Sequence, residues 1–376
     1  METGAVLLEK IFDMEAQKNP QTKNIALVVG ATGMSGSNLA DKLLDNGWEV
    51  YGLSRSSKIE NPEVKPITAD LLNVAQLTAA LQDVNPTHVF FTTWMRNDTE
   101  AENIRINSAL IRNVLDVLSE KKSVLHVALV TGLKHYLGPF EAYAKAGTLP
   151  ETPLRETQPR LDIDNFYYAQ EDEVYAAAKR DKFTWSVHRP HTLIGYAVGN
   201  LMNLGTTIAV YASICKEESL PFVWPGSEAQ WNGLSDVTDA GILADQLLWA
   251  ATTPDAQNEA FNIVNGDTFR WKWLWQKIAD YFGIEADGYN GSMRPLDERM
   301  AQKQQLWEKI AARENLKEAN LTRIASAWHT DLDLGRPIEV MTDMAKSRKL
   351  GFTAYRQTDE SFFELFDKLK QARIIP

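Results

Sequence analysis

Tyrosine and lysine side chains in the middle of the chain are its best candidates for chemistry. A phenol beside an ammonium group can donate a hydrogen bond to negative charge that forms on a substrate oxygen, and the cation lowers the pKa of the phenol. One such pair lies in Tyr175-Ala176-Ala177-Ala178-Lys179, where the two polar residues are one helical turn apart. A second pair is Tyr167 and Lys134, although the fourth residue after Tyr167 is Glu171 and not a lysine.

The stretch Asn24–Arg55 is the element that would position this chemistry. Ile25–Val29 is a short apolar run rich in β-branched residues, which is typical of a strand buried on both faces. Gly30, Gly33 and Gly36 follow it at a spacing of three, and a predicted helix and a second predicted strand come next. A strand, a glycine turn, a helix and a strand form the unit that holds a dinucleotide pyrophosphate at a helix N-terminus.

The residues after the second predicted strand indicate which dinucleotide would bind. An acidic residue at this place would bind the ribose 2′-hydroxyl group of NADH, whereas an arginine suits the 2′-phosphate of NADPH. This chain has Ser54-Arg55-Ser56 and no acid there. We therefore expect NADPH as the cofactor, the alternative being that Arg55 is a solvated surface charge.

The glycine spacing resembles that of short-chain dehydrogenases and reductases, whose catalytic tyrosine belongs to a helical Tyr-x-x-x-Lys motif. In that superfamily the helix and the next strand take more residues than the 14 that separate Tyr175 from Arg189. Tyr167 stands 22 residues before Arg189 and is the better candidate. We expect Tyr175 to be a buried helix residue and its lysine a solvated charge. The required cation is then Lys134, just past the fifth predicted strand.

Longer motifs narrow this resemblance to one family. They are Thr131-Gly132-x-Lys134-His135-Tyr136-x-Gly138-Pro139-Phe140, Pro159-Arg160-Leu161 and Asn165-Phe166-Tyr167-Tyr168-x-x-Glu171-Asp172. They are similar to the progesterone 5β-reductase/iridoid synthase family of atypical short-chain reductases, which lack Tyr-x-x-x-Lys. The similarity covers nearly the whole chain after residue 24. It implies that Lys134 and Tyr167 are catalytic, with Tyr168 as the alternative if the register slips by one residue.

The resemblance also implies a reaction, the NADPH-dependent reduction of the carbon–carbon double bond of α,β-unsaturated carbonyl compounds. Hydride would go to the β-carbon, and Tyr167 and Lys134 would stabilise the enolate. Two alternatives stay open at this point. One is an NADPH-dependent carbonyl reductase or dehydrogenase that acts on the C=O group with the same residues, and the other is a non-catalytic NADPH-binding regulator.

Candidate binding residues come from the glycine unit, the strand ends and the family motifs. The candidates for cofactor binding are Gly30, Thr32, Gly33, Met34, Gly36, Ser54, Arg55, Ser56, Asp70, Leu71, Thr93, Trp94, Thr131, Tyr167, Pro190, Thr192 and Leu193. The candidates for the substrate pocket are Trp94, Phe140, Met202, Trp328 and His329, each of which has core packing as its alternative role. No metal site is expected.

Two stretches depart from the family pattern. His191-Thr192-Leu193 stands where plant members carry Gly-Asn-Ile, and Trp328-His329 stands where many members have two aromatic residues. A histidine at the second place would make the pocket wetter. A steroid or iridoid substrate therefore does not follow from the resemblance.

Composition sets the broad class. The chain has 376 residues, 44% of them hydrophobic, and a formal net charge of −11, which argues against nucleic acid as its main partner. The single cysteine, Cys215, excludes an intrachain disulfide and lies in an apolar helical pattern. The eleven tryptophans suggest an aromatic-lined cavity or a dense second core.

No signal peptide or membrane span is apparent, so we expect a cytoplasmic protein with a small-molecule substrate and the possibility of a homodimer.

The order of predicted elements gives the fold class, an α/β Rossmann-type doubly wound parallel sheet of an extended short-chain dehydrogenase/reductase, with a smaller, mostly helical C-terminal lobe. Residues 24–200 are expected to form the NADPH-binding domain, with residues 233–264 returning to it. Residues 201–376 are expected to form the substrate-binding lobe. Residues 1–23 are expected to be a lead-in with a short helix.

Overall fold

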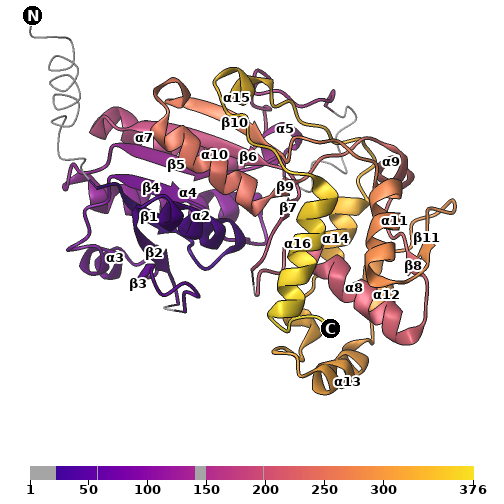
Figure 1. Ribbon diagram of the computed structural model, residues 1–376. Coiled ribbons are helices and arrows are strands. Elements are labelled where there is room, and N and C mark those ends of the chain that lie inside the picture. The colour runs from indigo at the N-terminus through magenta and orange to yellow at the C-terminus, as the bar shows by residue number, and fades with distance from the viewer. Residues whose placement is uncertain (1–22, 57, 140–149, 198) are drawn as a thin grey trace, which may run out of the picture.

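The computed structural model describes residues 23–376 except 57, 140–149 and 198 (Figure 1). The helix expected near the N-terminus and the candidate pocket residue Phe140 lie outside the described residues.

Seven parallel strands form the central sheet in the order β10-β6-β5-β4-β1-β2-β3 (Figure 1). This order confirms the expected doubly wound sheet, because the strands run outward in both directions from the neighbours β1 and β4. The strands of this sheet are β1 (Ile25–Val29), β2 (Glu49–Ser54), β3 (Lys65–Thr68), β4 (His88–Phe91), β5 (His126–Val130), β6 (Thr184–Pro190) and β10 (Glu259–Ile263).

Helices cover both faces of this sheet because its strands are apolar on both sides. On one face Ala26 and Val28 of β1 pack with Leu39 and Leu243. On the other face Leu27 of β1 belongs to a second core, to which three other helices contribute apolar residues. The first face carries α2 (Met34–Asp45) and α10 (Ala240–Thr252), and the second carries α3 (Val74–Ala80), α4 (Glu100–Ser119) and α7 (Phe166–Asp181).

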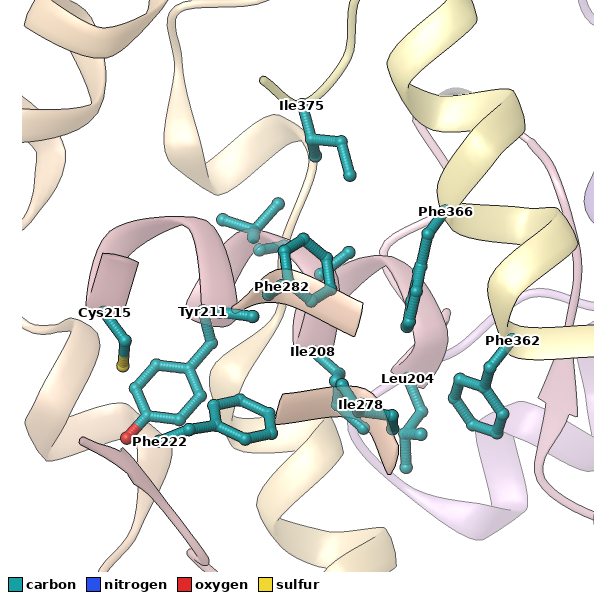
Figure 2. Close-up of a cluster of buried hydrophobic side chains, with 14 of the residues drawn as sticks. Leu204, Ile208, Tyr211, Cys215, Phe222, Ile278, Phe282, Phe362, Phe366 and Ile375 are labelled. Atoms are coloured by element: carbon teal, nitrogen blue, oxygen red, sulfur yellow. The ribbon is translucent and has the colours of Figure 1, made fainter. Parts of the chain in front are cut away.

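The C-terminal lobe is built around one large apolar core. Figure 2 shows Tyr211 and Cys215 of α8 (Leu204–Glu218) in this core, together with Phe222, Phe282 and Phe366. Four fully buried tryptophans belong to the same core, so the tryptophan-rich sequence forms a dense second core. They are Trp224, Trp271, Trp275 and Trp307. The buried thiol of Cys215 is packed here as a small apolar group.

The other elements of this half of the chain are short, except for the three helices α11, α13 and α16. They are β8 (Phe222–Val223), α9 (Glu228–Asn232), η1 (Pro254–Ala256), α11 (Trp271–Phe282), β11 (Ala286–Asp287), α12 (Leu296–Met300), α13 (Gln304–Glu314), η2 (Leu321–Arg323), α14 (Ala327–Leu334), α15 (Ala345–Lys349) and α16 (Thr358–Gln371). No helix in the described part of the chain is both long enough and apolar enough to cross a membrane.

Two short strands lie where the sheet meets the helical lobe (Figure 1). They are β7 (Leu193–Ile194) and β9 (Thr238–Asp239), which pair with each other in parallel and do not join the central sheet. Within residues 233–264, α10 and β10 pack on or in the central sheet. Met344 and Phe352, much later in the chain, also pack into the core under α2 and α10.

Candidate active site

The glycine turn brings the start of α2 against the tip of β1. Gly30 has φ 96°, and a Cβ there would lie 2.7 Å from the Cβ of Thr93. A Cβ on Gly36 would lie 2.2 Å from the carbonyl oxygen of Gly30, so only glycine allows the helix to approach the turn this closely. Gly33 precedes the first residue of α2 and supplies no capping side chain. The helix N-terminus with its backbone N–H groups is therefore suited to phosphate oxygens of a dinucleotide.

A cavity of about 220 Å³ lies beside this turn. Residues that follow β4, β5 and β6 line it, which is the edge where open α/β sheets bind ligands. The lining residues are Gly33, Met34, Ser35, Thr92, Trp94, Val130, Thr131, Gly132, Leu133, Lys134, Tyr167, Pro190, His191, Thr192, Leu193, Asn200, Met202, His329, Asp333 and Arg336. The cavity thus brings together the candidate pair Tyr167 and Lys134.

One asparagine links the two elements that carry this pair. Lys134 opens the short helix α5 (Lys134–Leu137) after β5, and Tyr167 lies in the first turn of α7. The side-chain oxygen of Asn165 accepts a hydrogen bond from the backbone N–H of Tyr167 at 3.0 Å, which caps α7. The amide nitrogen of the same Asn165 donates to the carbonyl oxygen of Lys134 at 2.7 Å. The Lys134 ammonium therefore reaches the cavity from a helix other than the one that carries Tyr167. In α7 itself, Glu171 stands where the superfamily has its lysine.

The Lys134 ammonium lies among aromatic rings. Its Nζ is 4.8 Å from the ring centre of Phe166, 4.9 Å from that of Trp94 and 5.8 Å from that of Tyr167. Burial lowers the pKa of Lys134 to about 8, while the carboxylate of Glu100 opposes this shift. An amine with such a pKa is still largely charged at neutral pH, and its charge is poorly screened by water.

A buried ionic cluster lies behind α5. Glu171, only 1% exposed, accepts a hydrogen bond from Arg160 at 2.8 Å and another from Arg189 at 3.4 Å. The His135 ring nitrogen is 3.7 Å from the same carboxylate. Arg189 in turn donates to the hydroxyl group of Tyr136 at 3.2 Å. These contacts hold His135 and Tyr136 of α5 in place, so Glu171 has a structural role where the superfamily places the cation.

A second, smaller cavity of about 120 Å³ holds many of the other cofactor candidates. It is lined by Gly30, Thr32, Leu53, Ser54, Arg55, Ala69, Asp70, Leu71, Thr93, Trp94, Met95 and Leu110. Asp70 also accepts a hydrogen bond from the backbone N–H of Leu72 at 3.0 Å, so this residue stabilises its turn as well as lining the cavity. Arg55 is exposed at the rim.

A few candidate residues lie outside both cavities. Ser56 accepts a hydrogen bond from Ser54 through its carbonyl oxygen and is exposed, and Gly36 serves the packing of α2. The Trp328 ring is 42% exposed and stacks on the guanidinium group of Arg96 at 4.4 Å, whereas its neighbour His329 lines the larger cavity.

The alternative tyrosines also lie elsewhere. The hydroxyl group of Tyr168 donates to the carbonyl oxygen of His135 and accepts from the backbone N–H of Leu161, so it is occupied away from the cavity. The Tyr175 ring packs on that of Trp185, with ring centres 4.4 Å apart, and Lys179 is exposed.

Sequence reasoning missed several residues of the larger cavity. The most polar are His191, Asp333 and Arg336, of which Arg336 comes from the segment after α14. The departure at His191 was visible in the sequence. Nothing in the sequence connected it with an arginine 145 positions later, because only tertiary packing joins the two.

Comparison with known proteins gives a family for nearly the whole chain. The model of the PRISE-like Rossmann-fold domain matches residues 68–376. An (S)-8-oxocitronellyl enol synthase of Nepeta cataria is 38% identical over 380 residues, which is 98% of this chain and 97% of that protein. A 3-oxo-Delta(4,5)-steroid 5-beta-reductase of Arabidopsis thaliana is 38% identical over 386 residues, or 99% and 98% of the two chains. The resemblance seen in the sequence motifs is confirmed.

Solved structures of proteins with much lower sequence identity confirm the fold. The UDP-glucose 4-epimerase of Thermus thermophilus, in complex with NAD, superposes with a TM-score of 0.62 at 15% sequence identity. The match covers 93% of this chain and 99% of that one. At such an identity the likeness extends to the extended Rossmann architecture and no further.

Proposed function

The chain belongs to the family of PRISE-like Rossmann-fold proteins, and we propose that it reduces the carbon–carbon double bond of α,β-unsaturated carbonyl compounds with NADPH. The observation that carries this proposal is the placement of Lys134 and Tyr167 on one cavity beside the glycine turn. Both groups stabilise negative charge on oxygen, which is what an enone gains when hydride adds to its β-carbon.

The chemistry then divides between cofactor and protein. NADPH, when bound, supplies the hydride. The Tyr167 hydroxyl group donates a hydrogen bond to the substrate carbonyl oxygen as the enolate forms there. The Lys134 ammonium attracts the negative charge on this oxygen, and the attraction is stronger in the buried site than in water. The α-carbon takes up a proton afterwards. The Lys134 side chain is buried and its ammonium lies over the rings of Trp94 and Phe166, so water screens its charge less than it would on the surface.

The names of the two relatives support hydride addition to a conjugated carbonyl compound. One relative is named for an enol product, and an enol is the O-protonated form of the enolate that hydride addition to an enal produces. The other is named for the reduction of a 3-oxo-Δ4,5 steroid, which is a conjugated enone. Both names fit a site that stabilises an enolate oxygen.

The proposal also includes the cofactor-binding residues and the boundaries of the two domains. The glycine turn would hold the pyrophosphate and Arg55 the 2′-phosphate, with the adenosine in the smaller cavity. Residues 24–200, with 233–264, would form the cofactor domain, and the lobe of residues 201–376 would cover the substrate. We further propose a cytoplasmic protein able to form a homodimer.

Removal of the Tyr167 hydroxyl group tests the mechanism. In Tyr167→Phe, turnover of a cyclic enone should fall about 100- to 1,000-fold, the usual cost of losing one oxyanion donor, while NADPH affinity changes little. Tyr175→Phe is the matched control, because that hydroxyl group lies outside the cavity. Wild-type turnover in Tyr167→Phe would remove this residue from the mechanism.

The product decides between the proposed reaction and its alternatives. A saturated ketone supports reduction of C=C, and an allylic alcohol would identify a carbonyl reductase. NADPH that binds but is oxidised with no enone or ketone would identify a regulator.

A further inference from the structure

Lys134 also lines a third cavity, of about 190 Å³. The walls of this cavity are the segment of residues 94–100, which joins β4 to the start of α4, together with Asn103, Lys134 and Pro139. The lysine that is proposed to stabilise the enolate therefore shares a cavity with Glu100, a partly buried carboxylate that the proposed reaction does not use.

Glu100 holds the start of the helix that carries Tyr167. Its Oε1 accepts a hydrogen bond from the backbone N–H of Phe166 at 2.7 Å, and its Oε2 accepts one from the side-chain amide of Asn103 at 3.1 Å. Phe166 and Tyr167 are the first two residues of α7, where a helix leaves its backbone N–H groups without partners of its own. Glu100 binds the first of these groups and Asn165 binds the second. The first turn of α7 is thus fixed from α4 as well as by its own cap.

The same contact places the side chain on which the Lys134 ammonium rests. The Nζ of Lys134 lies 4.8 Å from the centre of the Phe166 ring, and the backbone N–H of this phenylalanine is the group that Glu100 binds. Glu100 itself stands in the first turn of α4, where the helix dipole favours a negative charge. One carboxylate therefore contacts the backbone beside Tyr167 and holds the ring beneath Lys134.

The charge of Glu100 also acts on the amine. Burial lowers the pKa of Lys134, Glu100 opposes this shift, and the cationic Arg96 adds to it. Lys134 shares its two cavities with other charged or titratable groups, which could act on it in the same way. They are Asp98 in the third cavity, and Tyr167, His191, His329, Asp333 and Arg336 in the larger one.

The charged groups of the larger cavity balance one another. Asp333 accepts a hydrogen bond from Arg336, and His191 lies between Arg336 and the oppositely charged Asp236. Burial lowers the pKa of His329, so its ring is neutral.

The remaining groups leave one carboxylate to balance the amine. Asp98 is exposed, so water and salt screen its charge. The ionic cluster around Glu171, which holds the other residues of α5, contains both signs of charge. Among the described residues that line the two cavities, Glu100 is therefore the carboxylate placed to balance the Lys134 ammonium.

We propose that Glu100 is a positioning residue of the reaction, which fixes the first turn of α7 through the Phe166 N–H group and supplies the counter-charge of the Lys134 ammonium. The inference rests on the proposed function, in which Lys134 and Tyr167 stabilise the enolate. It adds that α4, which contributes none of the described residues that line the larger cavity, controls both members of this pair through one side chain.

Loss of the charge with little change of shape tests the counter-charge. Glu100→Gln keeps an oxygen that can accept from the Phe166 N–H group and removes the negative charge. The alkaline midpoint of kcat/KM for NADPH-dependent reduction of a cyclic enone should fall by about one pH unit, the lower end of the effect of a nearby opposite charge. The rate should stay near that of the wild type at pH 6 and be about tenfold lower above both midpoints. A merely structural defect would lower the rate equally at every pH.

A shorter carboxylate tests the positioning. Glu100→Asp keeps the charge but lacks the methylene group that lets the carboxylate reach the Phe166 N–H group. Its rate should fall roughly 10- to 100-fold at every pH, because the reacting groups shift, while its midpoint stays near that of the wild type. Glu102→Gln is the matched control, since Glu102 stands in the same turn of α4, is 42% exposed and pairs with Arg105. This variant should keep both the rate and the midpoint.

Several results would overturn the inference. An unchanged midpoint in Glu100→Gln would do so, and so would an equal fall in Glu102→Gln, which would assign the shift to the net charge of the surface. If the glutamine variant does not fold, Glu100→Asp decides the matter. A lower rate with a wild-type midpoint would support the inference, and a wild-type rate would refute it.

Failure of the proposed function gives a different result, because the wild type would then reduce no enone at any pH. The pKa of Lys134 can still be measured without turnover, from the pH dependence of its labelling by acetic anhydride, read by mass spectrometry. A pKa in Glu100→Gln about one unit below that of the wild type would support the counter-charge, and equal values would overturn it.

Discussion

The charge of Lys134 should control the rate of reduction at high pH. Burial lowers the pKa of this amine to about 8, well below that of a lysine in water. If the ammonium form stabilises the enolate, activity is complete below this pKa and falls as the pH rises through it. One pH unit above the pKa, about one amine in eleven is still charged, so kcat/KM should fall about tenfold. The negative charge of a bound dinucleotide favours the ammonium, so the midpoint should lie near or above 8.

The assay is the rate of NADPH oxidation with a saturating cofactor and a cyclic enone between pH 6 and 10. Lys134→Arg should remove the alkaline limb, because a guanidinium group stays protonated over this whole range. Lys134→Met should lose about 100- to 1,000-fold at every pH in the range. A wild-type rate that stays constant to pH 10 would refute the role of the ammonium. An alkaline limb that persists in Lys134→Arg would assign it to another group.

Three further predictions concern the cofactor, the ionic cluster and the sheet. Arg55→Asp should weaken NADPH more than NADH, and an unchanged ratio of the two Kd values would end the 2′-phosphate argument. Glu171→Gln should lower the free energy of unfolding by about 3 kcal/mol, because the buried guanidinium group of Arg189 loses its carboxylate partner; an unchanged urea midpoint would contradict this. Burial lowers the pKa values of His88, His126 and His188 to about 4, 3 and 4, below the 6.5 of an unfolded chain. Their stabilisation is therefore complete above pH 6.5 and is lost as the pH falls toward 4, by about 2 kcal/mol per histidine at pH 5. Urea unfolding at pH 8 and pH 5 measures this difference, and equal free energies would exclude it.

The sheet and its edge were predictable from the sequence because their signals are local. The apolar run Ile25–Val29, the glycine spacing and the helix and strand that come next each follow from neighbouring residues, and the structure has them in the expected order. The position of Lys134 at this edge followed from strand order, since residues just past parallel strands meet there. Its pairing with Tyr167, which lies in the first turn of α7, was implied by the family resemblance. The short helix that carries Lys134 was not predicted, because four residues give no periodic pattern.

The substrate side of the cavity was harder to predict. Trp328 and His329 were both expected to line it, but adjacent residues on a helix point about 100° apart. His329 faces the cavity and Trp328 faces Arg96, and the sequence alone does not set the rotation of α14. Arg336 was missed because its partners depend on how the lobe packs on the sheet.

Asn165 gives this site a property that a Tyr-x-x-x-Lys helix does not have. On one helix, the separation of phenol and amine is set by the helical repeat and cannot be adjusted without moving both groups. In this protein a single amide side chain joins two independent helices, capping one and bonding to the backbone of the other. The spacing between the two charge-stabilising groups can therefore be tuned from a residue that takes no part in the chemistry, which makes position 165 a natural starting point for redesign.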